Sequence, residues 1–118
     1  AMPNVHFLGR VDDLAPYYLQ ATAVVAPILS GSGLKTKTVE ALRYGKYVIG
    51  SAEAFEGIPI LNYPGAGCEC HNTSDYISLI NSLKIAKTNE ASLRLFDEQF
   101  STATQFKRFS EFIMSTAQ

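Results

Sequence analysis

The sequence predicts an α/β fold in which a parallel sheet carries helices on both faces. Short apolar runs without polar alternation recur along the chain, and this pattern is typical of strands buried on both faces. Amphipathic segments with helical spacing separate these runs. This alternation favours right-handed strand–helix–strand units, whose strand-to-helix loops meet at the carboxyl edge of the sheet.

The first predicted elements follow this order. Residues 5–9 form an apolar run that ends at a glycine, so we expect a buried strand there. Asp12 or Asp13 caps a helix that continues to about Ala21. Residues 23–27 form a second buried strand, which a glycine loop follows.

The next helix is predicted from about residue 35 to residue 44. Gly45 supplies its left-handed stop, and residues 47–50 form a third buried strand. The residues expected on the buried face of this helix are Leu34, Thr38, Ala41 and Leu42.

Residues 51–66 are rich in glycine and proline, which indicates a connecting loop with at most a short strand around Ile60. A short edge strand is expected within residues 67–71. Asn72 or Thr73 then caps a helix. The apolar stripe of that helix consists of Tyr76, Ile77, Ile80 and Leu83.

Two helices are expected after this point. The first covers roughly residues 90–99, and Ser101 caps the second. The apolar side of the closing helix consists of Phe106, Phe109, Phe112 and Ile113.

Composition narrows the classes of function. With 118 residues and a formal net charge of −1, the chain is one domain without the basic balance typical of nucleic-acid binding. No apolar run approaches the roughly 20 residues that span a bilayer. Cys68 and Cys70 are too close in one strand for an easy disulfide, and with His71 they fall short of the about four ligands of a zinc site. We therefore predict reduced cysteines and no metal.

The glycine loop and the helix after it carry the candidate site. Gly31 and Gly33 let the backbone approach a bulky anion, and the helix opening points unpaired N–H groups at it. Lys35 and Lys37 occupy the first turn, where the helix dipole alone prefers carboxylates, so they favour a bound phosphate or diphosphate. Glu40 follows one turn later and can accept hydrogen bonds from hydroxyls. An ordinary surface ion pair between Lys37 and Glu40 is the structural alternative.

In order and spacing, these residues resemble the C-terminal half of a retaining glycosyltransferase of the GT-B fold, in the glycosyl transferases group 1 family. The resemblance covers about the first half of the chain. The matching residues are Val5 to Leu14, Tyr18, Ala21, Val25 to Pro27, Gly31 to Gly33, Lys37, Glu40 to Leu42, Gly45, Val48, Ile49 and Glu56 to Ile58.

The resemblance implies a Rossmann-like domain that binds a nucleoside-diphosphate sugar as substrate, with neither a cofactor nor a metal. Residues 1–118 would be a partial donor-binding domain, truncated at its N-terminus, with residues 1–2 as a tag remnant. The ribose hydroxyls would bind Glu40. The nucleobase would pack near Gly9, Val11 and Leu14; the diphosphate and sugar would meet Gly31, Ser32, Gly33, Leu34 and Lys35, with support from Lys37.

Other features of the resemblance concern the rest of the enzyme. Ser32 stands where many family members carry a first glutamate. The catalytic residues stay unassigned, because the family's cleft is shared with an N-terminal domain that this chain lacks, and the fragment alone is expected to be inactive. The acceptor is expected to be a bacterial polysaccharide or lipopolysaccharide. The expected location is the cytoplasm, with the inner membrane face as an option through the missing domain.

Two alternatives stay open at this point. One is a non-catalytic α/β module that binds a nucleotide or another phosphate ligand, and the other is a nucleotide-sugar epimerase of the GT-B fold. We expect no nucleic-acid partner. Truncation of the sheet would leave an open strand edge, which makes a homodimer of the fragment an expected partner state.

Overall fold

Three short parallel strands form the sheet of the computed structural model, which describes residues 5–27, 36–84, 88–101 and 104. The strands are β1 (Ala23–Ala26), β2 (Tyr47–Gly50) and β3 (Gly67–Glu69), and β2 lies between the other two. In the register, Val24 lies beside Val48, and Val48 lies beside Gly67. The prediction of a parallel α/β class is therefore confirmed, with β3 as an edge strand.

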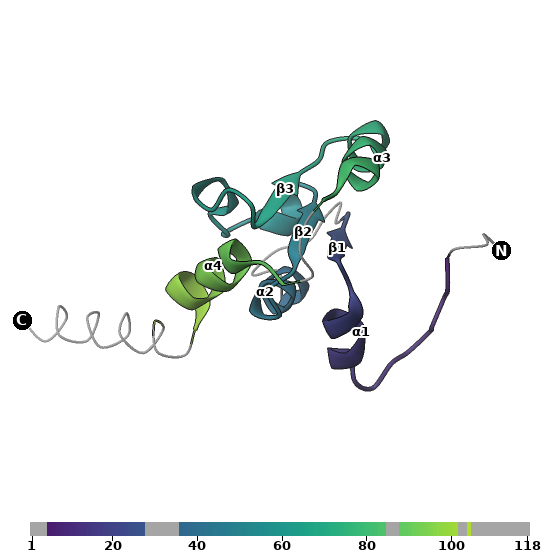
Figure 1. Ribbon diagram of the computed structural model, residues 1–118, viewed down its shortest axis with the longest axis horizontal. Coiled ribbons are helices and arrows are strands. Elements are labelled where there is room, and N and C mark those ends of the chain that lie inside the picture. Colours follow the sequence, from purple (N-terminus) through teal and green to yellow (C-terminus); the bar gives the residue numbers. More distant parts are fainter. Residues whose placement is uncertain (1–4, 28–35, 85–87, 102–103, 105–118) are drawn as a thin grey trace, which may run out of the picture.

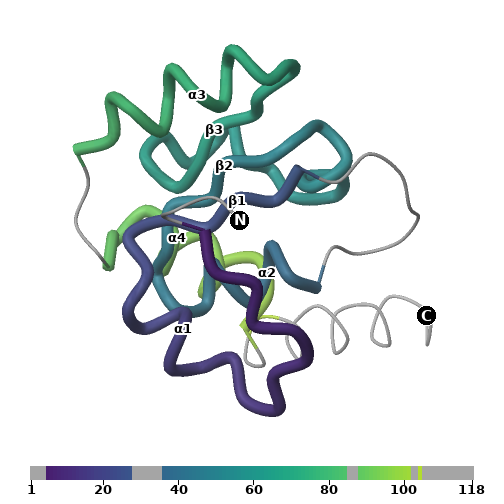
Figure 2. The backbone as a smooth tube through the Cα atoms, turned by 90° about the vertical axis from the view of Figure 1, so that its right-hand side faces the viewer, coloured from purple at the N-terminus to yellow at the C-terminus, as the bar shows by residue number. Residues whose placement is uncertain are grey.

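Helices lie on both sides of this sheet (Figures 1 and 2). Figure 2 shows α3 (Thr73–Ser82) on one side and α1 (Ala15–Gln20), α2 (Thr36–Arg43) and α4 (Glu90–Phe100) on the other. The predicted inner face of α2 is confirmed at Thr38, Ala41 and Leu42, which are fully buried. Leu34 lies outside the described residues.

The core lies between the sheet and the pair α2 and α4. Val48 of β2, Leu42 of α2 and Leu95 of α4 have no exposed surface. A buried hydrogen bond of 2.7 Å from Ser92 Oγ of α4 to the Lys46 carbonyl ties α4 to the start of β2. Because α4 is fixed in this way, it forms one wall of the region beside α2.

Gly45 ends α2 as predicted, and its carbonyl also binds the start of α4. Its φ of +72° lies in the left-handed region that favours glycine. A Cβ at this position would lie 2.7 Å from the Thr88 side chain. The Gly45 carbonyl also accepts a hydrogen bond of 2.8 Å from the Asn89 N–H, so the turn after α2 holds the start of α4.

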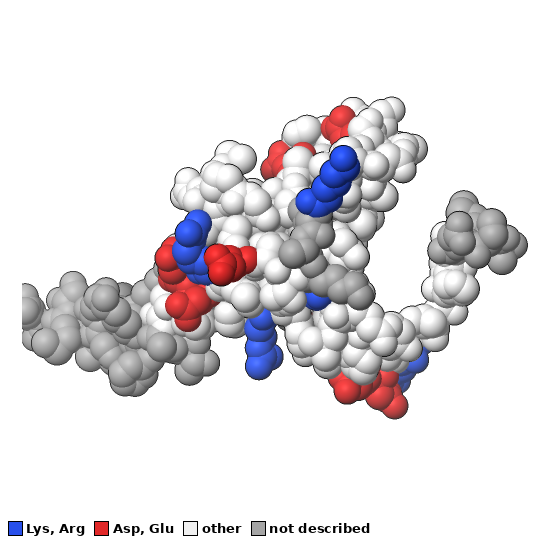
Figure 3. Space-filling view, in the orientation of Figure 1, with Lys and Arg blue, Asp and Glu red and all other residues white. Residues whose placement is uncertain are grey.

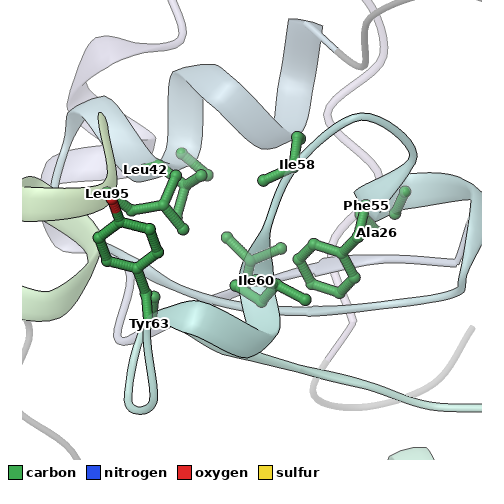
Figure 4. Packing of buried hydrophobic residues seen from close by; sticks show 11 residues of the cluster. Ala26, Leu42, Phe55, Ile58, Ile60, Tyr63 and Leu95 are labelled. Carbon is green, nitrogen blue, oxygen red and sulfur yellow. The ribbon is translucent and has the colours of Figure 1, made fainter. Parts of the chain in front are cut away.

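The connection between β2 and β3 contributes much of the core (Figure 4). It contains two 3₁₀ turns, η1 (Glu53–Phe55) and η2 (Ile60–Asn62). The prediction of a connecting loop over residues 51–66 is therefore confirmed, and the short strand that it allowed around Ile60 does not form. Pro59 has no N–H to donate to a ladder, and short bonds such as Asn62 N–H to the Pro59 carbonyl curl the chain instead. The buried apolar residues of this connection are Ala54, Phe55, Ile58, Ile60, Tyr63 and Ala66.

The buried strand predicted at residues 5–9 is wrong. This segment is extended but belongs to no sheet, and it runs apart from β1 (Figure 1). Phe7 is 91% exposed, and Val5 and Leu8 are exposed as well. A strand is stabilised by a partner that bonds its backbone, and β1 has β2 as its only partner within the described part of the chain.

Most helix starts agree with the sequence. Asn72 Oδ1 accepts a hydrogen bond from the Asp75 N–H at 2.9 Å, so Asn72 is the N-cap of α3. The prediction that Asp12 or Asp13 is the N-cap of α1 is wrong, because the N-cap is Leu14. Asp13 Oδ1 still accepts a hydrogen bond from the N–H of Ala15, the first residue of the helix. Ser101 Oγ accepts a bond from the Thr104 N–H, as a cap does. The predicted apolar side of the closing helix, namely Phe106, Phe109, Phe112 and Ile113, lies outside the described residues.

Candidate functional site

The start of α2 holds the part of the predicted site that the structure describes. Lys37 lies in the first turn and is exposed, and Glu40 lies one turn later and is half-buried. Between them, Thr38 Oγ1 donates a buried hydrogen bond of 2.8 Å to the Ala54 carbonyl, which anchors the helix to η1. The loop residues Gly31, Ser32, Gly33, Leu34 and Lys35 lie outside the described residues.

Glu40 faces a hollow of about 560 Å³ between α2 and α4. Its lining residues on α2 recur with helical spacing, and Phe96 of α4 forms the opposite wall. The described lining consists of Thr36, Val39, Glu40, Arg43 and Phe96. The hollow thus combines a carboxylate, a guanidinium and an aromatic side chain, which suit a ligand with hydroxyls, negative charge and a flat face.

Arg43 was absent from the predicted site. Its position three residues after Glu40 places both on one side of α2, and this spacing is the signal that could have revealed it. Lys37 is absent from the described lining of this hollow, and no ion pair within the described residues joins it to Glu40. The structural alternative of a surface pair between these two residues therefore finds no support.

A stacked pair of tyrosines lies close to Glu40. The rings of Tyr18 and Tyr44 are nearly parallel, at an interplanar angle of 6°, with centroids 5.1 Å apart. Burial raises the pKa of Tyr18 above its ordinary value of 10.0, and the negative charges of Glu40 and Tyr44 raise it further. The Glu40 carboxylate is thus close enough to act electrostatically on α1, which is a contact that sequence spacing did not reveal.

The residues expected near the nucleobase, Gly9, Val11 and Leu14, are not in the described lining of the hollow at Glu40. Leu14 lines a hollow of about 220 Å³ with α1 and the first residues of β1, Ala23 and Val24. This is the amino end of β1, so the structure does not bring Leu14 to the carboxyl edge. Gly9 is exposed with a φ of +67°, and Val11 is half-buried. Since residues 5–9 lie outside the sheet, nothing in the described structure anchors their loop beside α2.

A third hollow, of about 630 Å³, lies where the three strands end. Pro27 follows β1, Ser51 follows β2 and Cys70 follows β3, and the first turns of α3 close the other side. Open α/β sheets bind ligands at this edge. The hydroxyl of Tyr76 is buried here with no hydrogen-bond partner among the described atoms. Burial raises the pKa of Tyr76, with smaller contributions from Cys70 and Glu53.

The described residues show neither a metal-binding group nor a membrane-spanning helix. They contain no group of three or more His, Cys, Asp or Glu side chains placed to hold a metal ion. Within them, no helix is both long enough and apolar enough to cross a bilayer. On the face in Figure 3, the Lys and Arg side chains stand apart from one another, and several have acidic side chains beside them.

The parallel sheet with helices on both sides defines the class of the protein, an α/β domain, and the polar hollow beside α2 is its candidate site. Comparison with known families narrows this class. The family model for glycosyl transferases group 1 matches residues 1–83. This match covers well over half of the chain, so the protein belongs to that family, and its general function is that of a glycosyltransferase. Searches of curated proteins and of solved structures returned no match.

Proposed function

We propose that this chain is the donor-binding part of a retaining glycosyltransferase of the GT-B fold and that it holds a nucleoside-diphosphate sugar. The observation that carries the proposal is the half-buried Glu40 in a polar hollow, one turn into the helix that follows β1. The family match supports the type of reaction. An α/β domain places a helix start of this kind where anions bind.

In the proposed complex, the Glu40 carboxylate accepts hydrogen bonds from the ribose hydroxyls. Lys37, in the first turn of α2, offsets the charge of the diphosphate together with the helix N-terminus. Residues Gly31 to Lys35 supply backbone N–H groups to the diphosphate and sugar. As the glycosyl group departs, negative charge grows on the diphosphate, and cations already held in place lower the barrier.

The acceptor is held by a second domain of the same enzyme. Placing donor and acceptor together supplies roughly 7–11 kcal/mol toward the barrier, so this domain binds the donor without transferring the sugar by itself. The acceptor that we propose is a growing bacterial surface glycan, and the reaction takes place in the cytoplasm at the inner face of the membrane.

The test is donor binding by the full-length enzyme. We expect Glu40→Ala and Lys37→Ala each to weaken the binding of a nucleoside diphosphate by about ten-fold or more, because a hydrogen bond to a charged group contributes roughly 1.5–3 kcal/mol. Calorimetric titration with UDP, GDP and ADP in parallel measures the effect and identifies the base.

Two exposed residues away from the hollow provide matched controls. Glu90→Ala and Lys84→Ala remove the same charges from the described surface and should leave the affinity unchanged. If Glu40→Ala and Lys37→Ala bind every nucleotide as tightly as these controls do, the assignment of the donor site to α2 is wrong.

A further inference from the structure

The two cysteines of the chain lie close together, because Cys68 is in β3 and Cys70 directly follows the strand. The Cys70 N–H donates to the Gly50 carbonyl of β2, so the backbone there still runs along the sheet. Both side chains line the same hollow. The Cys68 thiol also contacts the Glu69 carbonyl at 3.6 Å. The fold therefore brings the two thiols of the sequence to one hollow.

The pair is open to small reagents from one side. Cys68 is half-buried, whereas Cys70 is only 3% exposed. Both line a hollow of about 440 Å³ between β3 and α3, whose other walls include Asp75 and Leu79. A small oxidant that enters this hollow has better access to Cys68, because Cys68 is the more exposed of the two.

Cys70 is the more deeply buried of the two thiols. Burial raises the pKa of Cys70, and the neighbouring Cys68 and Asp75 raise it further. Cys70 therefore stays protonated at neutral pH and is slow to react with an oxidant from solution. A thiol of this kind is suited to react second, with an oxidised neighbour in the same hollow.

We propose that Cys68 and Cys70 form a reversible redox pair that closes an intrastrand disulfide in the presence of a peroxide. The Cys68 thiolate attacks one peroxide oxygen and breaks the O–O bond, which leaves a sulfenic acid on Cys68. The departing hydroxide takes up the proton that the Cys68 thiol had released and becomes one water. The Cys70 sulfur then attacks the Cys68 sulfur. The hydroxyl group on the Cys68 sulfur leaves with the Cys70 thiol proton as a second water. The two sulfurs have then lost two electrons to the peroxide.

Closing this bond changes the end of β3. Two residues of a strand span about 6.6 Å, whereas disulfides favour Cα separations of roughly 5.5–6 Å, so the strand must shorten locally. The nearest sheet hydrogen bond runs from the Cys70 N–H to the Gly50 carbonyl at 2.8 Å. Just beyond it, the His71 N–H donates to the Asp75 carboxylate at the start of α3. Oxidation therefore loosens the carboxyl edge of the sheet.

The strain also makes the bond easy to reduce. Strained disulfides have more oxidising potentials than structural ones and are the labile members of their class. The resting state in a reducing compartment is therefore the dithiol, which agrees with the prediction of reduced cysteines. The disulfide forms when peroxide rises and disappears when a dithiol reductant returns.

Mass spectrometry of the purified protein tests the proposal. After treatment with hydrogen peroxide, the peptide that contains both cysteines should lose two hydrogen atoms in mass, and the free-thiol titre should fall from two to zero. Dithiothreitol should restore both values. Cys68→Ser and Cys70→Ser provide matched controls, because each leaves one thiol that gains oxygen atoms and closes no internal bond.

A second readout tests the structural consequence. Amide hydrogen exchange at Cys70 and His71 should become faster by about ten-fold or more on oxidation, because their hydrogen bonds are disturbed, while exchange in α4 stays unchanged. Peroxide that only adds oxygen to wild-type cysteines, or that links two chains, overturns the proposal. An internal disulfide without any change in exchange overturns the proposed loosening of the edge.

Discussion

The two faces of the sheet differ in how completely they are covered. On the face toward α2 and α4, Val48, Leu42 and Leu95 have no exposed surface. On the face toward α3, Ile49 is fully buried, yet its register partner Val25 is 46% exposed. α3 itself has no buried residue, and Ile77 and Ile80 of its predicted apolar stripe are exposed.

This difference follows from connectivity. The covered face is completed by segments close to β2 in the chain, namely α2 before it and the 51–66 connection after it. On the other face, coverage decreases toward β1, the strand that has one partner within the described residues. Parallel strands are normally buried on both faces, so Val25 marks a surface that another element is suited to cover.

The substitution with the largest expected effect on stability lies on the covered face of the sheet. Leu95→Ala should lower the free energy of unfolding by about 2–5 kcal/mol, because a buried leucine is replaced by a cavity. The matched change on the other face, Ile80→Ala, should cost only about 0.5 kcal/mol, because that side chain is already exposed. Urea denaturation followed by circular dichroism measures both. Equal losses would show that the two faces are packed alike.

The second effect tests the open edge of β1. We expect the isolated chain to associate through this edge, since unpaired N–H and C=O groups beside an apolar face pair readily with another copy. Val25→Lys should abolish the association, because charged side chains blunt strand edges. Light scattering over a range of concentrations measures the association, with Leu61→Lys as a control at an exposed apolar site away from β1. A strict monomer at high concentration contradicts the prediction.

The smallest effect tests the contact between Glu40 and Tyr18. The folded-state pKa of Tyr18 is raised, so the unfolded chain releases this proton first as pH increases. The corresponding contribution to stability is complete below about pH 10 and is lost as pH rises through the folded-state pKa. Glu40→Gln should lower the pKa of Tyr18 toward its ordinary value, because a nearby negative charge disappears.

Ultraviolet titration of tyrosinate absorbance measures this change when Tyr18→Phe is used to identify the signal. Tyr76 serves as an internal control, because its raised pKa results from burial, Cys70 and Glu53 rather than from Glu40. An unchanged Tyr18 titration in Glu40→Gln would mean that the carboxylate points away from α1.

Local patterns in the sequence predicted the elements whose ends depend on near neighbours. Asn72 caps α3 because its side chain reaches an N–H three residues ahead, and Gly45 ends α2 because it adopts a positive φ. The buried strand at residues 47–50 was predictable because an unbroken apolar run is typical of a strand covered on both faces. Glu40 was predicted from its place one turn after the glycine loop, which is also a local relation.

Only the tertiary structure decided what depends on distant partners. Residues 5–8 have the apolar composition of a strand, but no described neighbour bonds their backbone, so they stay outside the sheet. The 51–66 connection has loop composition, yet Phe55, Ile58 and Ile60 are buried because α2, α4 and the sheet leave room for them. Through packing, Phe96 comes to the hollow of Glu40, and Cys68 and Cys70 come to one hollow beside α3. A sequence pattern reports what a segment favours locally, whereas burial and contact depend on which surfaces the rest of the chain brings to it.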